Sequence, residues 1–133
     1  MTAPILILFM IFCHIVDDYY LQGWLASAKQ KKWWEDNAPD TLYKNDYIWA
    51  LVMHSFSWSF MIMLPILIYH FKEIIIGTPM TAWYLLFFIV NMLIHGIVDD
   101  LKANKKKFSL IDDQVCHMMQ IFLTAMAFSV IIV

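Results

Sequence analysis

Charged side chains are scarce in this sequence. Only 15% of its 133 residues are Asp, Glu, Lys or Arg, whereas about a quarter of a typical soluble domain is charged. Hydrophobic residues make up 62%, which is more apolar surface than a soluble core of this length can bury. The composition therefore excludes a soluble enzyme and a disordered chain, and the length leaves room for a single domain over residues 1–133.

Arginine is absent and cysteine is rare. Because all nine basic residues are lysines and the net charge is −2, the basic footprint of a nucleic-acid-binding protein is missing, and we expect no nucleic-acid partner. Cys13 and Cys116 both lie in apolar runs, which excludes a disulfide framework.

Long apolar runs, by contrast, dominate the chain. A helix that crosses a bilayer needs about 20 apolar residues, and four runs reach that length, over about residues 3–26, 47–69, 80–101 and 109–133. Helices are expected because each helix satisfies its own backbone hydrogen bonds in lipid. The sequence therefore predicts an all-α integral membrane protein, a four-transmembrane-helix antiparallel bundle that forms one transmembrane domain.

Prolines and capping residues mark the ends of these predicted helices. Thr78-Pro79 is typical of a helix start. Ser109 with Asp112, three residues later, predicts a capping pair. Pro65 lies inside the second span and is expected to kink that helix or end it early.

The lysines are distributed unevenly between the connections. The first and third connections hold four lysines each, whereas the second holds only Lys72. Because lysine-rich connections face the cytoplasm, we expect a multi-pass protein with both termini outside the cytoplasm.

The first connection carries tryptophans and tyrosines beside its lysines, as segments at the headgroup level do. We expect a short interfacial helix over residues 24–34, between the first two spans. Its Lys29, Lys31 and Lys32 are candidates for binding a lipid headgroup. The alternative interpretation of this segment is a plain membrane anchor.

Ionisable residues within the spans are the main functional signal, because such residues are costly in a membrane. Three spans carry a His and an Asp four residues apart, which places both on one helix face. The pairs are His14 with Asp18, His95 with Asp99, and Asp113 with His117, and the second span contributes His54. In an antiparallel bundle these residues fall in one layer, about 10 Å from the cytoplasmic ends of the helices.

Imidazole and carboxylate groups in one dry layer indicate metal binding. The candidate ligands are His14, Asp18, His54, His95, Asp99, Asp113 and His117. This set suits two divalent ions bridged by a carboxylate, with Zn ahead of Mn or Fe. The candidate catalytic residues are Asp17, Asp18 and Asp113, and the expected outer partners of the ligands are Gln22, Asn91, Gln114 and Gln120. The competing interpretation is a polar network that only fixes helix packing.

These motifs resemble a known family. The segments are His14-x-x-x-Asp18-x-x-x-Gln22, Ala50-Leu51-x-x-His54, His95-x-x-x-Asp99 and Asp113-Gln114-x-x-His117. Together they resemble, over nearly the whole chain, the small membrane family known as domain of unknown function 3307. The resemblance implies a protein of bacterial or phage origin in the bacterial inner membrane, with its site at the His, Asp and Gln residues of these motifs. A more distant likeness to predicted membrane-bound metal-dependent hydrolases favours hydrolysis.

The leading hypothesis is an integral-membrane metal-dependent hydrolase that acts on a lipid-linked phosphate or ester at the cytoplasmic leaflet. The cation would lower the pKa of water, and one of the three candidate catalytic aspartates would orient or deprotonate that water. The alternatives are a metal or proton transporter, or a non-enzymatic membrane effector with a structural metal. Membrane lipid is the expected partner, and a homo-oligomer is left open.

Overall fold

A computed structural model describes residues 2–131, with side chains described up to residue 130. Every regular element in this range is a helix, and no strand forms there. The elements are α1 (Ala3–Val16), η1 (Asp17–Leu21), α2 (Leu25–Ala28), α3 (Lys31–Asn37), η2 (Thr41–Tyr43), α4 (Asp46–Tyr69), α5 (Phe71–Ile75), α6 (Pro79–Ala103) and α7 (Leu110–Ile131). Of these, η1 is a π-helical turn and η2 is a 3-10 turn.

The all-helical prediction is confirmed, and three helical segments are long and apolar enough to cross a membrane. They span Ala3–Leu21, Thr41–Tyr69 and Pro79–Ala103. α7 has 22 residues but is not among them, and its first half carries several polar side chains. Residues 132 and 133, the end of the predicted fourth span, lie outside the described residues. A fourth crossing and a four-helix antiparallel bundle therefore stay predictions.

The first span ends earlier than predicted. α1 continues into η1, which ends at Leu21, whereas the predicted span ran to residue 26. Gly23 has a φ of +51°, a left-handed conformation that glycine adopts without strain, and here the chain leaves the helix. Hydropathy did not reveal this break, because apolar residues continue on both sides of the glycine.

The segment predicted as one interfacial helix over residues 24–34 forms two short helices, α2 and α3. Trp24, Trp33 and Trp34 pack edge to face, with ring centroids 5.0 to 6.0 Å apart. Trp34 Nε1 also donates a hydrogen bond to the Ala28 carbonyl oxygen, at 2.7 Å. These aromatic contacts join α3 to the end of α2.

The predicted helix ends are confirmed in two of three places. α6 begins at Pro79 directly after Thr78, and Asp112 Oδ2 accepts hydrogen bonds from the backbone N–H and the hydroxyl of Ser109, at 2.9 and 2.7 Å. Of the two alternatives for Pro65, an early end of the helix is wrong, because α4 continues to Tyr69, and a kink stays a prediction. Helices in a membrane tolerate proline when neighbouring groups satisfy the freed carbonyl.

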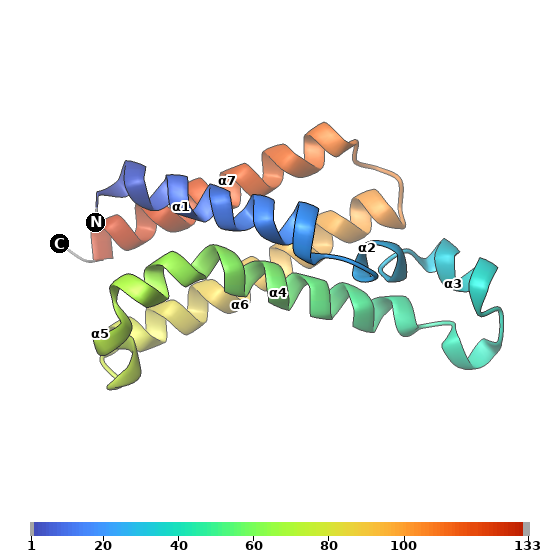
Figure 1. The fold of residues 1–133 in the computed structure, drawn as a ribbon, viewed down its shortest axis with the longest axis horizontal. Coiled ribbons are helices and arrows are strands. Elements are labelled where there is room, and N and C mark those ends of the chain that lie inside the picture. Colours follow the sequence, from blue (N-terminus) through green and yellow to red (C-terminus); the bar gives the residue numbers. More distant parts are fainter. Residues whose placement is uncertain (1, 132–133) are drawn as a thin grey trace.

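The long helices lie side by side (Figure 1). α4 packs against α1 and α6, and α7 also packs against α1 and α6. Both termini and α5 lie at one end of the molecule, and α2, α3 and the α6–α7 connection lie at the other end (Figure 1). We call the second end the lysine-rich end, because eight of the nine lysines belong to its connections.

The interior has an apolar part and a polar part. Side chains such as Leu6, Met10, Ile62, Ile121 and Phe128 form an apolar core toward the termini. The buried His and Asp side chains, except His70, lie toward the lysine-rich end, while many large apolar side chains remain exposed on the outer faces of the helices. A polar interior under an apolar outer surface suits a lipid environment rather than water.

The side chain of Trp58 is fully buried at the boundary between these two parts. We expect Trp58→Ala to lower the free energy of unfolding by about 3–5 kcal/mol, because the truncation leaves a large cavity. Denaturant unfolding in detergent, followed by circular dichroism, measures the change. Trp49→Ala is the control on the same helix, since that side chain is 68% exposed, and its effect should stay within about 0.5 kcal/mol. Equal losses in the two variants would contradict the packing.

Candidate metal centre

Five of the seven predicted ligands meet in the polar part of the interior. They are Asp18 from η1, His54 from α4, His95 and Asp99 from α6, and His117 from α7. Among the described residues they form two overlapping groups that share His95, and the ligand atoms of each group lie within 4.8 Å of one another. No side chain of the five is more than 9% exposed. Such a cluster can hold a cation away from bulk water.

Asp99 lies between the two groups. Its Oδ2 is 3.3 Å from His54 Nε2, and its Oδ1 is 3.5 Å from His117 Nε2. On the first side, His54 Nε2 also lies 3.4 Å from Asp18 Oδ1 and 3.1 Å from His95 Nε2. On the second side, His117 Nε2 lies 3.4 Å from Asp113 Oδ1. One carboxylate therefore faces ligands on both sides, as a bridging ligand does.

The π-helical turn η1 brings two consecutive aspartates into the interior. In a regular α-helix, neighbouring residues point about 100° apart, yet Asp17 is 1% exposed and the Asp18 side chain only 9%. Asp17 Oδ1 accepts a hydrogen bond from the Ser57 hydroxyl at 2.6 Å, and its Oδ2 lies 4.0 Å from His54 Nδ1. Asp17 thus approaches the ring nitrogen of His54 opposite the one that faces Asp18. That is where a residue that orients a metal-binding histidine stands.

Several buried polar atoms of this cluster have no hydrogen-bond partner within the described chain. They are Asp17 Oδ2, Asp18 Oδ1, His54 Nδ1, His95 Nδ1, Asp113 Oδ1 and His117 Nε2. Each such atom costs about 1–3 kcal/mol when it stays unpaired. A network that served only to fix helix packing would have paired them. Oxygen and imidazole nitrogen atoms are also the donors that divalent transition metals prefer, so the residues fit a metal ion.

His14 lies beside the cluster but is engaged elsewhere. Trp58 Nε1 donates to His14 Nδ1 at 2.8 Å, and His14 Nε2 lies 3.0 Å from Gln114 Oε1. Because an indole nitrogen can only donate, Nδ1 must accept, and Nε2 then carries the proton that it donates to Gln114. Both nitrogens are occupied within the protein, so His14 belongs to neither group of possible ligands, and its role as a ligand stays a prediction.

Two lysines contact the carboxylates of the cluster, and sequence reasoning did not anticipate this. Lys29 Nζ lies 2.5 Å from Asp99 Oδ2, and Lys102 Nζ lies 2.6 Å from Asp113 Oδ2. Lys29 is only 7% exposed, so the expectation that it reaches out to a lipid headgroup does not fit its position. Lys31 and Lys32 are exposed and pair with acidic residues of their own helix.

The four predicted outer partners lie in three places. Gln22 donates to the Asp18 carbonyl oxygen at 2.9 Å, and Gln114 also donates to Asp113 Oδ2 at 3.1 Å. Gln120 Oε1 lies 3.4 Å from His117 Nδ1, and its amide donates to the carbonyl oxygen of Asn91. Asn91 in turn donates to the hydroxyl of Thr124 at 2.9 Å. Gln22 therefore supports the backbone of η1, Gln114 joins Asp113 to His14, and Gln120 with Asn91 extends the polar network away from the ligands.

Trp58 is the functional side chain that sequence reasoning missed. Its ring stacks on His95, with centroids 4.1 Å apart and an interplanar angle of 18°, and it holds His14 through the hydrogen bond described above. The available signal was its spacing: Trp58 follows His54 by four residues and therefore shares its helix face.

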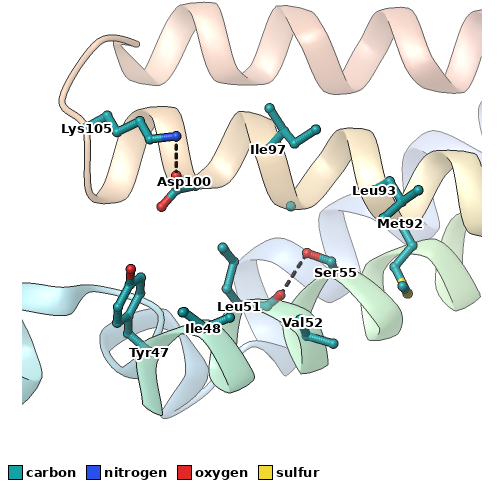
Figure 2. A pocket seen from close by; sticks show the side chains of 11 residues that line it. Tyr47, Ile48, Leu51, Val52, Ser55, Met92, Leu93, Ile97, Asp100 and Lys105 are labelled. Atoms are coloured by element: carbon teal, nitrogen blue, oxygen red, sulfur yellow. Dashed lines mark hydrogen bonds and ion pairs between the residues drawn. The ribbon is translucent and has the colours of Figure 1, made fainter. Parts of the chain in front are cut away.

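Among the cavities near the lysine-rich end, two are lined in part by α6. The first, of about 300 Å³, is lined by residues that include Asp18, Asp99, Lys29 and Lys102, and so reaches the ligands directly. The second, of about 360 Å³, lies between α4 and α6 and is mostly apolar (Figure 2). Figure 2 shows the Lys105–Asp100 ion pair, at 2.8 Å, at one end of this cavity. No ligand of the two groups lines the second cavity, so the first is the route to the cluster.

Comparison of the chain with protein-family models, with curated proteins and with solved structures finds no match in any of the three. The resemblance to domain of unknown function 3307 and to the hydrolases therefore stays a prediction from the motifs.

The Lys29–Asp99 pair can be tested without any metal. We expect Lys29→Met to lower the free energy of unfolding of chelator-treated protein by about 3 kcal/mol, because it leaves the Asp99 carboxylate buried without its ammonium partner. Denaturant unfolding in detergent measures the loss. Lys32→Met is the control, since the Lys32 side chain is 71% exposed, and it should cost less than about 1 kcal/mol. A loss as small as that of the control would show that Lys29 does not balance the charge of Asp99.

Proposed function

We propose that this chain is an integral-membrane metal-dependent hydrolase, with a His/Asp centre for two divalent cations, that acts on a lipid-linked phosphate or ester. The observation that carries the proposal is the convergence of Asp18, His54, His95, Asp99 and His117 from four separate elements in one buried cluster. A packing network needs neither this concentration of imidazole and carboxylate nor so many unpaired atoms.

A fourth membrane crossing by α7 completes the proposed antiparallel bundle. Its 22 residues extend about 33 Å, which is enough for the hydrocarbon core of a bilayer. Exposed apolar side chains run along its outer face from Leu110 to Val130, while Asp113 and His117 point inward and are fully buried. With both termini at one end and eight lysines at the other, the lysine-rich end is the cytoplasmic one.

The two overlapping ligand groups support two cations rather than one. Asp17, Asp18, Asp99 and Asp113 bring four carboxylates into the interior, against which the structure sets the ammonium groups of Lys29 and Lys102. Buried charges need partners; after the two lysines, one divalent ion would balance the remaining charge, and a second would leave net positive charge for a bound anion to offset. Asp99 would bridge the two ions, with Asp18 and His54 on one side, His117 and Asp113 on the other, and His95 within reach of both. Three imidazoles among these ligands favour zinc, with manganese and iron as alternatives.

The chemistry of such a centre is hydrolysis. A bound cation polarises a phosphoryl or carbonyl group and lowers the pKa of water. Asp17, whose Oδ2 lies 4.0 Å from His54 Nδ1, would orient His54 by closing this distance to a hydrogen bond. Asp113 has one oxygen next to His117 and no hydrogen-bond partner for it in the described chain, so it is our first candidate for accepting a proton. Asp18 lines the open cavity and is the second candidate.

Transport fits the interior less well than hydrolysis does. The polar network reaches from His117 through Gln120 and Asn91 to Thr124. Beyond Thr124 the apolar core of Leu6, Met10, Ile121 and Phe128 fills the space toward the termini in the described part of the chain. A proton or metal path needs polar groups through the full membrane thickness, and this interior offers them on one side.

The metal proposal is tested by elemental analysis of protein purified in detergent. We expect two divalent ions per chain in the wild type and fewer than one in His95→Ala, because His95 belongs to both ligand groups. His70→Ala is the control, since this histidine lies outside the cluster at the end of α4, and it should keep both ions. Two results would contradict the metal centre: wild-type protein that holds no metal after zinc reconstitution, or an equal loss of bound metal in the two variants. The cluster would then be a polar network that fixes helix packing.

Hydrolysis is tested with the zinc-loaded protein on lipid phosphates, lipid diphosphates and carboxylic esters. We expect Asp113→Asn to lower kcat by about 10²–10⁴ if Asp113 accepts the proton. Asp112→Asn is the neighbouring control, because Asp112 is exposed and caps α7, and it should keep its rate. If the zinc-loaded wild type cleaves no member of the panel, the result would contradict the proposed hydrolase activity and favour a structural role for the metal.

A further inference from the structure

The cavity of about 300 Å³ beside the metal centre has an unusual lining for a site in a membrane. It lies between η1, α6 and α7, and three of its lining residues are Lys29, Lys102 and Lys106. The carboxylates of Asp18 and Asp99 form its floor toward the candidate metal ligands. Cations bound at those carboxylates would leave a cavity with positive charge on every side. Such a cavity selects an anion.

Lys106 is the lysine best placed to meet an incoming anion. Lys29 and Lys102 already contact Asp99 and Asp113, whereas Lys106 forms no ion pair within residues 2–131. It is exposed at the mouth of the cavity. Its backbone φ of +53° is the left-handed conformation, which is uncommon outside glycine. Lys106 thus joins the cavity lining from a left-handed position in the α6–α7 connection.

An apolar groove continues from the same cavity. It has a volume of about 710 Å³, lies between α1 and α7, and is lined by Ile7, Ile11, Val115, Met118, Met119 and Phe122, among others. The groove shares Tyr19, Leu110 and Gln114 with the polar cavity. A basic polar compartment that opens into an apolar one fits a molecule with an anionic head and an apolar tail. In a membrane that molecule is a phospholipid.

We propose that the polar cavity and the α1–α7 groove together form the binding site for one lipid with a terminal phosphate group. Lys106 and Lys102 contact the phosphate, and the groove holds an acyl chain. This inference rests on the proposed function, because the cations of the metal centre must offset Asp18 and Asp99 before an anion binds. It differs from headgroup binding by Lys31 and Lys32, which lie on α3 and do not line the cavity.

The phosphate half of the site is tested by Lys106→Asn in zinc-loaded protein in detergent, since Asn accepts a left-handed φ. The probes are dioleoyl phosphatidic acid and inorganic phosphate, and native mass spectrometry and calorimetry measure their dissociation constants. We expect Lys106→Asn to raise the dissociation constants of both probes by about fivefold. Lys107→Asn removes the same charge from the same exposed connection but does not line the cavity, and it should bind as the wild type does. Equal binding by the two variants overturns the phosphate site.

The acyl-chain half is tested by filling the groove. Val115→Trp places a large side chain in the groove. We expect it to weaken the binding of phosphatidic acid by about tenfold and to leave the binding of inorganic phosphate unchanged. Leu123→Trp is the matched control, because Leu123 is similarly exposed on the same helix, at 58% against 55% for Val115, and does not line the groove. If Val115→Trp binds phosphatidic acid as tightly as Leu123→Trp does, the groove does not hold an acyl chain. This result would overturn the lipid site in favour of a site for free phosphate.

Counting bound zinc in each sample separates this inference from the proposed function. Zinc-loaded wild type that binds neither phosphate probe overturns the lipid site and leaves the metal centre intact. Wild type that holds no zinc overturns the metal centre itself.

Discussion

The Asp99 carboxylate is the contact on which the polar interior depends. It lies on α6 and meets Lys29 beyond α2, His54 on α4 and His117 on α7, so one buried negative charge holds four parts of the chain together. A carboxylate is stable there only when cations or hydrogen-bond donors surround it. The positions of Lys29, Lys102 and the histidines follow from this requirement, and so does the fit to metal ions, which supply positive charge more compactly than lysine side chains.

The interior is divided into an apolar half and a polar half, and this division determines from which side a ligand can reach the Asp99 carboxylate. The core toward the termini packs apolar side chains such as Met10, Ile62 and Phe128, and the hydroxyl of Tyr84 is one of the few polar groups buried there. The polar half opens instead into a basic cavity and, through it, into an apolar groove. An interior that is apolar on one side and has cavities on the other fits the proposed reaction at one leaflet better than passage across the bilayer.

Much of the candidate site could be predicted from spacing. His95 with Asp99, and Asp113 with His117, lie four residues apart and share a helix face, and the structure keeps both pairs in contact at 3.8 and 3.4 Å. Spacing along one helix does not tell what a neighbouring helix presents. For this reason spacing does not indicate the stacking of Trp58 on His95, the contacts of His14 with Trp58 and Gln114, or the pairing of Lys29 with Asp99.

The sequence by itself determined that the chain is helical, apolar enough for a membrane, and charged mainly at one end, because hydropathy and lysine position are local properties of composition. The tertiary structure alone decided that the first long helix ends with a π-helical turn at Leu21 and that this turn brings Asp17 and Asp18 into the interior together. It also decided which carboxylates meet lysines. Contacts between residues 70 positions apart, such as Lys29 with Asp99, depend on helix packing, and no local pattern encodes them.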